Sequence, residues 1–76
     1  MTASPDIFVR RFGEQVLLHR RRLDLSQEQL SERAGVHRNL VGRVERADVV
    51  PTLTTMVRLA DALGTKVSEL MRDAGH

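Results

Sequence analysis

The sequence predicts a small all-α domain of five helices. Apolar residues recur at spacings of three and four, which is typical of one buried helix face, and no stretch alternates apolar and polar residues as a strand would. With 76 residues there is room for one domain only, so residues 1–76 are expected to form a single unit. Cysteine is absent and Phe8 and Phe12 are the only aromatic residues, so the core should be aliphatic.

The first helix is expected over residues 6–23. Ser4, Pro5 and Asp6 form a typical helix start, and the cations at 20–22 fall in the last turn, where the helix dipole favours them. His19 lies on the apolar stripe and is interpreted as a half-buried histidine rather than a ligand. The inward face is predicted to carry Phe8, Val9, Phe12, Val16 and Leu23.

Two short helices should follow, separated by a tight turn. Ser26 and Gln29 have the S-x-x-Q spacing of a capping box, and Gly35 is a typical stop, which predicts a helix of about nine residues. After Gly35 and Val36, a third helix is expected over residues 37–46. Its inward side is predicted to carry Val41 and Val44.

Two further helices complete the predicted chain. Pro51 and Thr52 indicate the start of a fourth helix with Thr52 as its N-cap, and Gly64 should end it. Its predicted inward residues are Leu53, Met56, Val57, Leu59, Ala60 and Leu63. A fifth helix is expected from about residue 66 to residue 72, with Val67 and Leu70 on its apolar side.

The block from about residue 26 to residue 46 is the informative feature. Its turn is too short for two antiparallel helices, and a glycine with small or apolar neighbours suits a helix pair that crosses at a steep angle. This is the pattern of a helix-turn-helix. In such a unit the second helix enters the major groove of DNA, while the first crosses the phosphate backbone.

The outward side of the predicted third helix carries residue types that read bases. Arginine can donate two hydrogen bonds to guanine, and asparagine can pair with adenine in the same way, which makes Arg38, Asn39 and Arg43 candidate base contacts. Gly42 is expected to face outward as well; glycine costs about 1 kcal/mol in a helix, so DNA or another group should approach the backbone there. On residue types alone, a solvated charged face with an incidental glycine stays equally open.

Residues 12–70 resemble the lambda-repressor-like helix-turn-helix domains of the XRE family. The matching segments are LSQEQLSERAGV (25–36), RVER (43–46) and PTLTTMVRLADALG (51–64), in the expected order. The resemblance implies that Gln27 contacts phosphate and braces the recognition helix, and that Arg38, Asn39 and Arg43 touch base edges. Where the family often has glycine this chain has Ala47, so Asp48 is expected to take the left-handed conformation.

Overall charge does not by itself indicate a nucleic-acid partner. The formal net charge is +2, and the pI of about 10.4 reflects the arginines, which make up eleven of the twelve cations. The positions of the cations are therefore a better indicator of a nucleic-acid partner than the net charge. The run Arg20 to Arg22 is interpreted as a solvated helix end rather than a DNA contact. Candidate backbone contacts are Gln27, His37, Arg46, Thr52 and Thr54.

A single small module should bind double-stranded DNA weakly, so affinity is expected from a homodimer on a palindromic operator. The dimer interface should lie on the helical domain itself. Its candidate residues are apolar and lie outside the predicted inward set or near the end of the last helix: Val49, Val50, Leu70 and Met71. The alternative is that Leu70 belongs to the core and the valines only cover the loop.

Other function classes have little support. His19, His37 and His76 are scattered, and no catalytic, metal or cofactor motif occurs, so no enzyme activity, metal or cofactor is expected. No segment is apolar enough to span a membrane, and a cytoplasmic, nucleoid-associated protein of a prokaryote or phage is predicted. Within the family, residues 17–46 look most like restriction-modification controller proteins. The alternatives are a phage Cro-like repressor and an antitoxin, whose partner would be a toxin protein.

Overall fold

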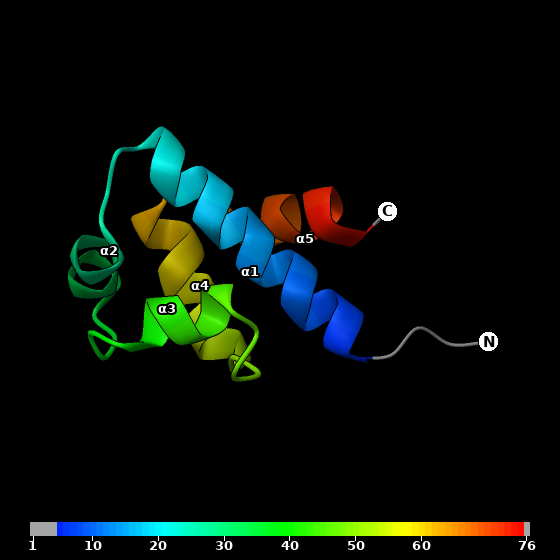
Figure 1. Cartoon of the computed structure of the whole chain (residues 1–76). Coiled ribbons are helices and arrows are strands. Elements are labelled where there is room, and N and C mark those ends of the chain that lie inside the picture. Colours follow the sequence, from blue (N-terminus) through cyan, green and yellow to red (C-terminus); the bar gives the residue numbers. More distant parts are fainter. Residues whose placement is uncertain (1–4, 76) are drawn as a thin grey trace.

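Five helices follow one another in the computed structural model, which describes residues 5–75 and the side chains of residues 6–72. They are α1 (Pro5–Arg22), α2 (Gln27–Ala34), α3 (Leu40–Glu45), α4 (Leu53–Ala62) and α5 (Val67–Gly75) (Figure 1). Ser4 and His76, named above, lie outside the described residues. Residues 5–75 contain no strand, and the predicted all-α, five-helix fold is confirmed.

The long helix α1 runs across the molecule and packs on α3 and α5, while α2 packs on α3 and α4 (Figure 1). The buried core is aliphatic apart from one phenylalanine, and every helix contributes to it. Its members are Phe12, Val16, Leu30, Ala34, Val41, Val44, Leu59, Ala60, Leu63 and Leu70. The periodicity predicted most of these residues.

Gly13 permits the crossing of α1 over α3. It is buried, and a Cβ added to it would overlap the carbonyl oxygen of Val44 and lie 3.1 Å from that of Glu45. Only glycine allows the two backbones to approach this closely. Helical periodicity does not reveal this role of Gly13, and the available signal in the sequence was a glycine inside a predicted helix.

Helix ends agree with the predictions to within about one residue except at α5, which runs to Gly75 rather than to residue 72, and at α3, which begins at Leu40 rather than at His37. Residues 37–39 form a turn instead. The His37 carbonyl oxygen accepts from the Leu40 amide at 2.9 Å, and the Asn39 amide donates to His37 Nδ1 at 3.2 Å. These two bonds hold the residues in front of α3 without an α-helical turn.

Four predicted inward residues are exposed. Phe8 and Leu23 lie near the two ends of α1, and Leu53 and Val57 lie on an uncovered side of α4, where Leu53 is 67% exposed. Helical spacing identified the apolar face correctly, but a face is buried only where another element packs against it.

Two further expectations are corrected. Leu70 is completely buried in the core of the single chain, so it cannot lie on a dimer surface as predicted. At the end of α3, Ala47 rather than Asp48 takes the left-handed conformation, with φ of 59°. The left-handed position of this helix ending is the one after the cap residue Arg46, which is Ala47, and the Asp48 amide then donates to the Arg43 carbonyl at 2.9 Å.

Candidate nucleic-acid interface

The unit α2–turn–α3 is held by local hydrogen bonds that the sequence specifies. Ser26 Oγ accepts from the Gln29 amide at 3.0 Å, and the Ser26 amide donates to Gln29 Oε1 at 2.8 Å, which confirms the capping box. At the other end of α2, Gly35 has φ of 69°, and the Val36 amide donates to the Ser31 carbonyl at 3.0 Å. The chain therefore leaves α2 sharply and enters α3 after a short turn.

The inner side of this unit fixes how α3 is rotated. Val41 and Val44 are completely buried, as predicted. Ser31 is buried at the junction of α2 with the turn, where its hydroxyl donates to the Arg38 carbonyl at 3.3 Å. Because the valines face inward, α3 can present only its opposite side to a partner.

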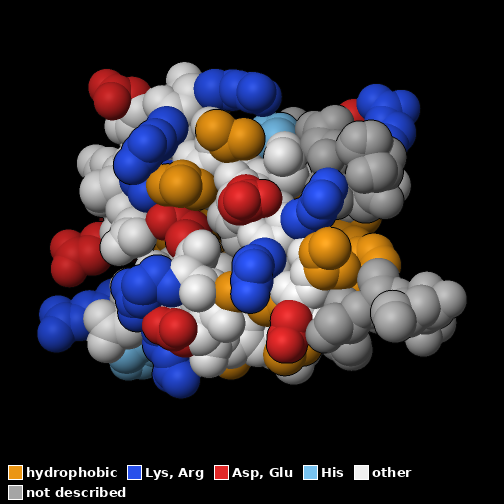
Figure 2. All heavy atoms as spheres, turned by 45° about the vertical axis from the view of Figure 1, so that its right-hand side comes forward, with side chains coloured by type: hydrophobic (Ala, Val, Ile, Leu, Met, Phe, Trp, Pro, Cys, Tyr) orange, Lys and Arg blue, Asp and Glu red, His pale blue; other side chains and the backbone are white. Residues whose placement is uncertain are grey.

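The predicted DNA contacts are all exposed. They are Gln27, Arg38, Asn39, Arg43, Arg46, His37, Thr52 and Thr54. Three of them, His37, Asn39 and Arg43, line one small hollow with Leu40, while Arg38 borders a neighbouring hollow against α2. Figure 2 shows Lys and Arg side chains gathered with a histidine at the lower left of that view. The fold therefore brings Asn39 and Arg43 together at one hollow, whereas Arg38 lines a separate hollow beside α2.

Gly42 does not face outward, and this prediction was wrong. It is buried beneath side chains of its own chain: a Cβ there would lie 3.1 Å from Gln27 Oε1 and 3.1 Å from Arg46 Nη1. The close approach inferred from this glycine is real in the free protein, but the approaching groups are Gln27 and Arg46.

A buried ion pair joins α1, α2 and α3 behind this surface. Glu45, whose side chain is 5% exposed, accepts from Arg20 Nε at 2.7 Å and from Arg20 Nη2 at 3.0 Å. Gln27 Nε2 donates to the same carboxylate at 2.8 Å, and Arg20 Nη1 donates to the Leu25 carbonyl at 2.8 Å. Arg20 is therefore not part of a solvated helix end as interpreted from the sequence, because its charge is used inside the fold.

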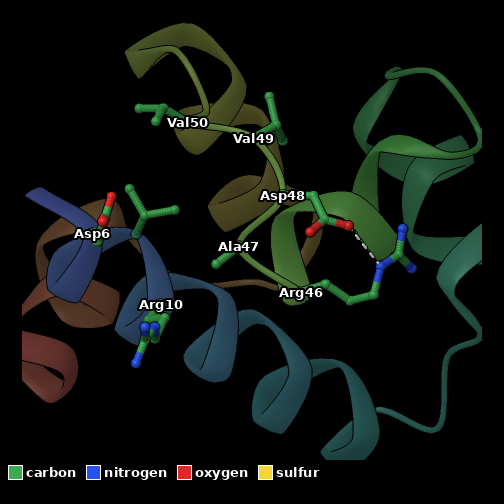
Figure 3. Close-up of a pocket in the computed structure, with 8 residues that line it drawn as sticks. Asp6, Arg10, Arg46, Ala47, Asp48, Val49 and Val50 are labelled. Carbon is green, nitrogen blue, oxygen red and sulfur yellow. Dashed lines mark hydrogen bonds and ion pairs between the residues drawn. The ribbon is translucent and has the colours of Figure 1, made fainter.

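An exposed ion pair lies at the end of α3. Arg46 Nε donates to Asp48 Oδ2 at 2.9 Å, with the two side chains 61% and 54% exposed (Figure 3). The close-up also shows Ala47 at the bend between them. Arg46, which is predicted to contact phosphate, is thus paired with the Asp48 carboxylate in the free protein.

Thr52 is the N-cap of α4, as predicted, since its Oγ1 accepts from the Thr55 amide at 3.1 Å. The same hydroxyl donates to Thr55 Oγ1 at 3.1 Å. Thr54 is exposed in the first turn of α4. Thr52 therefore supports the helix start, whereas Thr54 presents its side chain to the surroundings.

Two kinds of feature are absent from the described residues. Within residues 5–75, no helix combines the length and apolar character needed to cross a bilayer. The same part of the chain holds no group of three or more His, Asp or Glu side chains that could bind a metal ion.

Comparison with known proteins agrees with this geometry. A helix-turn-helix family model matches residues 18–70. The chain is 45% identical over 63 residues to control protein C.SmaI of Serratia marcescens, covering 83% of this chain and 75% of that protein. It is 34% identical over 59 residues to the immunity repressor protein of Bacillus phage phi105, covering 78% of this chain but only 41% of the repressor.

Solved structures give the same result. The restriction-modification controller protein C.AhdI from Aeromonas hydrophila superposes with a TM-score of 0.78 at 35% identity, covering 82% of this chain and 94% of that one. A hypothetical transcription factor, NHTF from Neisseria, gives a TM-score of 0.81 at 27% identity, covering 93% of this chain and 84% of that one.

The fold and the exposed basic side of α3 define a helix-turn-helix DNA-binding regulator. The chain belongs to the lambda-repressor-like helix-turn-helix family, as the sequence motifs indicated, and is similar to the restriction-modification controller proteins within it. The relatives named above are regulatory proteins rather than enzymes.

Proposed function

We propose that the protein is a restriction-modification controller that binds a palindromic operator as a homodimer. The observation that carries this proposal is the α2–turn–α3 unit, in which the buried valines turn Arg43 outward on α3 and the turn before α3 leaves Arg38 and Asn39 exposed. These side chains would read base edges in the major groove. The similarity to two controller proteins supports the biological role.

Backbone contacts would hold α3 in register on the duplex. Their proposed donors are Gln27, His37, Arg46, Thr52 and Thr54, all exposed and placed on α2, on α4 or beside α3. Contacts of this kind set orientation and carry no sequence information themselves. They would make affinity fall as salt rises.

The dimer interface is proposed on the side where α1 begins and α5 passes. A groove there is lined by apolar residues alone: Phe8, Val9, Phe12, Val50, Pro51, Met56 and Met71. Val50 is 71% exposed at this groove, and Figure 2 shows apolar side chains reaching the surface on the right of that view. Val50 and Met71 of the predicted interface line the groove, and Val49 lies beside Val50 in the loop.

A second copy on this face would present two α3 helices to one side of the DNA. Recognition helices of such dimers enter successive major grooves about 34 Å apart. The operator would accordingly be an inverted repeat. Such a protein would work in the cytoplasm of a prokaryote, on the nucleoid or on phage DNA.

Selection of bound duplexes from a random pool, combined with the mass of the complex, tests this function. Enrichment of an inverted repeat and a mass of two chains per duplex are expected. A single enriched half-site with one bound chain would contradict the dimer, and absence of any enriched sequence would contradict the regulator itself.

The similarity to a phage immunity repressor favours a phage repressor as the second candidate. A neighbouring endonuclease gene would support the controller, and neighbouring phage genes the repressor. The antitoxin alternative requires that a toxin protein co-purifies with the chain.

A further inference from the structure

The contact between Gln27 and Glu45 connects the buried ion pair with the DNA-facing surface. Gln27 is the first residue of α2 and is exposed, yet its Nε2 donates to the buried Glu45 carboxylate at 2.8 Å. Its Oε1 lies over Gly42. Both ends of this side-chain amide therefore have defined neighbours on α3.

We propose that Glu45 is a positioning residue for DNA binding, which acts by holding the Gln27 amide in the orientation that donates to phosphate. This inference rests on the proposed function. An amide nitrogen has two hydrogens, so the bond to Glu45 leaves one for an incoming phosphate oxygen. A side chain ordered before binding loses less conformational entropy when the complex forms.

Arg20 makes this arrangement compatible with an anionic partner. Its guanidinium binds both oxygens of Glu45, at 2.7 and 3.0 Å, and neutralises the carboxylate behind Gln27. Without that cation, the carboxylate would repel the phosphate that Gln27 is placed to meet. Glycine at position 42 leaves room for the Gln27 amide, because a Cβ there would lie only 3.1 Å from Gln27 Oε1.

The decisive variant is the double substitution Arg20→Met/Glu45→Met. It removes the acceptor of Gln27 while leaving the formal net charge of +2 unchanged, because one cation and one anion are lost together. Apolar residues of similar size often replace a buried ion pair without loss of stability. The matched control is Glu69→Met/Arg72→Met, which removes the exposed pair of α5 at 3.0 Å.

DNA affinity should be measured for these variants with and without Gln27→Ala, on the selected duplex and at a temperature where circular dichroism shows every variant folded. Gln27→Ala should weaken binding roughly tenfold, the effect of losing a hydrogen bond to a charged group. Arg20→Met/Glu45→Met should weaken binding by a similar factor, because a Gln27 amide that nothing holds no longer meets the phosphate. Combining them should add no further loss, and the α5 control should bind as the parent does.

Binding of Arg20→Met/Glu45→Met at parental affinity would overturn the proposal, as would a full tenfold cost of Gln27→Ala added to that background. In either case, sequence-selective binding by the parent protein would still support the proposed regulatory function. If the parent selects no duplex at all, the proposed function fails before the positioning role is reached.

A measurement on the unmodified chain covers the case in which the double variant does not fold. Nuclear magnetic resonance relaxation of the Gln27 side-chain amide in the free protein should give an order parameter close to that of the α2 backbone. The amide of Gln15 on α1 serves as comparison. A Gln27 amide as mobile as a typical surface glutamine, ordered only when DNA is added, would contradict the proposal.

Discussion

Gly13 of α1 lies against the carbonyl oxygen of Val44 in α3, with no room between them for a side chain. This crossing sets the position of the C-terminal end of α3 against the longest helix of the molecule. Since Glu45 and Arg46 follow Val44 directly, the same crossing places the residues that border the candidate interface.

Gly13→Ala should destabilise the fold by about 1–3 kcal/mol, because the new methyl group meets backbone atoms that cannot rotate away. Thermal and urea unfolding measure this loss. Gly42→Ala is the matched control, since its methyl group would meet only the ends of side chains, which can shift where backbone atoms cannot, and alanine favours the helix. Equal losses for the two variants would show that the α1–α3 crossing is not the cause.

Ala47→Gly should stabilise the protein by about 0.5–1 kcal/mol. Ala47 has φ of 59°, a conformation in which the Cβ is crowded and which glycine adopts freely. Ala62→Gly, in the last turn of α4, should have the opposite effect because glycine disfavours a helix. A lower midpoint of urea unfolding for Ala47→Gly would refute this explanation.

Arg38→Ala should cost about 1–3 kcal/mol of DNA affinity and relax discrimination at one base pair. Gln27→Ala should instead weaken binding to specific and scrambled duplexes alike, because phosphates are the same in both. Fluorescence anisotropy on the two duplexes measures both effects, with Arg72→Ala on α5 as control. Unchanged sequence preference for Arg38→Ala would remove Arg38 from the base-reading set.

Asp48→Asn should tighten binding up to about fivefold at low salt, because Arg46 no longer has to leave a carboxylate to reach phosphate, and an exposed ion pair contributes at most about 1 kcal/mol. Asp61→Asn removes an equal charge from the exposed side of α4 and should have a smaller effect. In an Arg46→Ala background the gain should fall to that of the Asp61 control. If Asp48→Asn still tightens binding by the full amount in the Arg46→Ala background, the loss of a negative charge explains the gain and the release of Arg46 does not.

Val50→Lys should dissociate the proposed dimer, because a charge would enter a groove lined by apolar side chains. Sedimentation equilibrium measures the change in association. Leu23→Lys is the control, since Leu23 is also exposed but follows the opposite end of α1. If the dimer survives Val50→Lys but dissociates with Leu23→Lys, the interface lies at the other end of α1.

Local chemistry explains which features the sequence predicted well. The capping box of Ser26 and Gln29, the left-handed Gly35 and the Thr52 cap depend only on residues a few positions apart. The burial of Val41 and Val44 follows from helical spacing within one short segment. The same spacing predicted the exposure of Arg43, whereas Arg38 and Asn39 are exposed in a turn that was predicted as helix.

The sequence by itself determined five helices, their order and the outward side of α3. Only the tertiary structure decided which side chains support α3 from behind, because these contacts join residues far apart in the chain. Arg20 meets Glu45 across 25 positions and Gln27 meets Glu45 across 18, and no local pattern marks either contact. Packing also buried Leu70 and Gly42 and left Leu53 exposed, since a helix face is covered only where another helix crosses it.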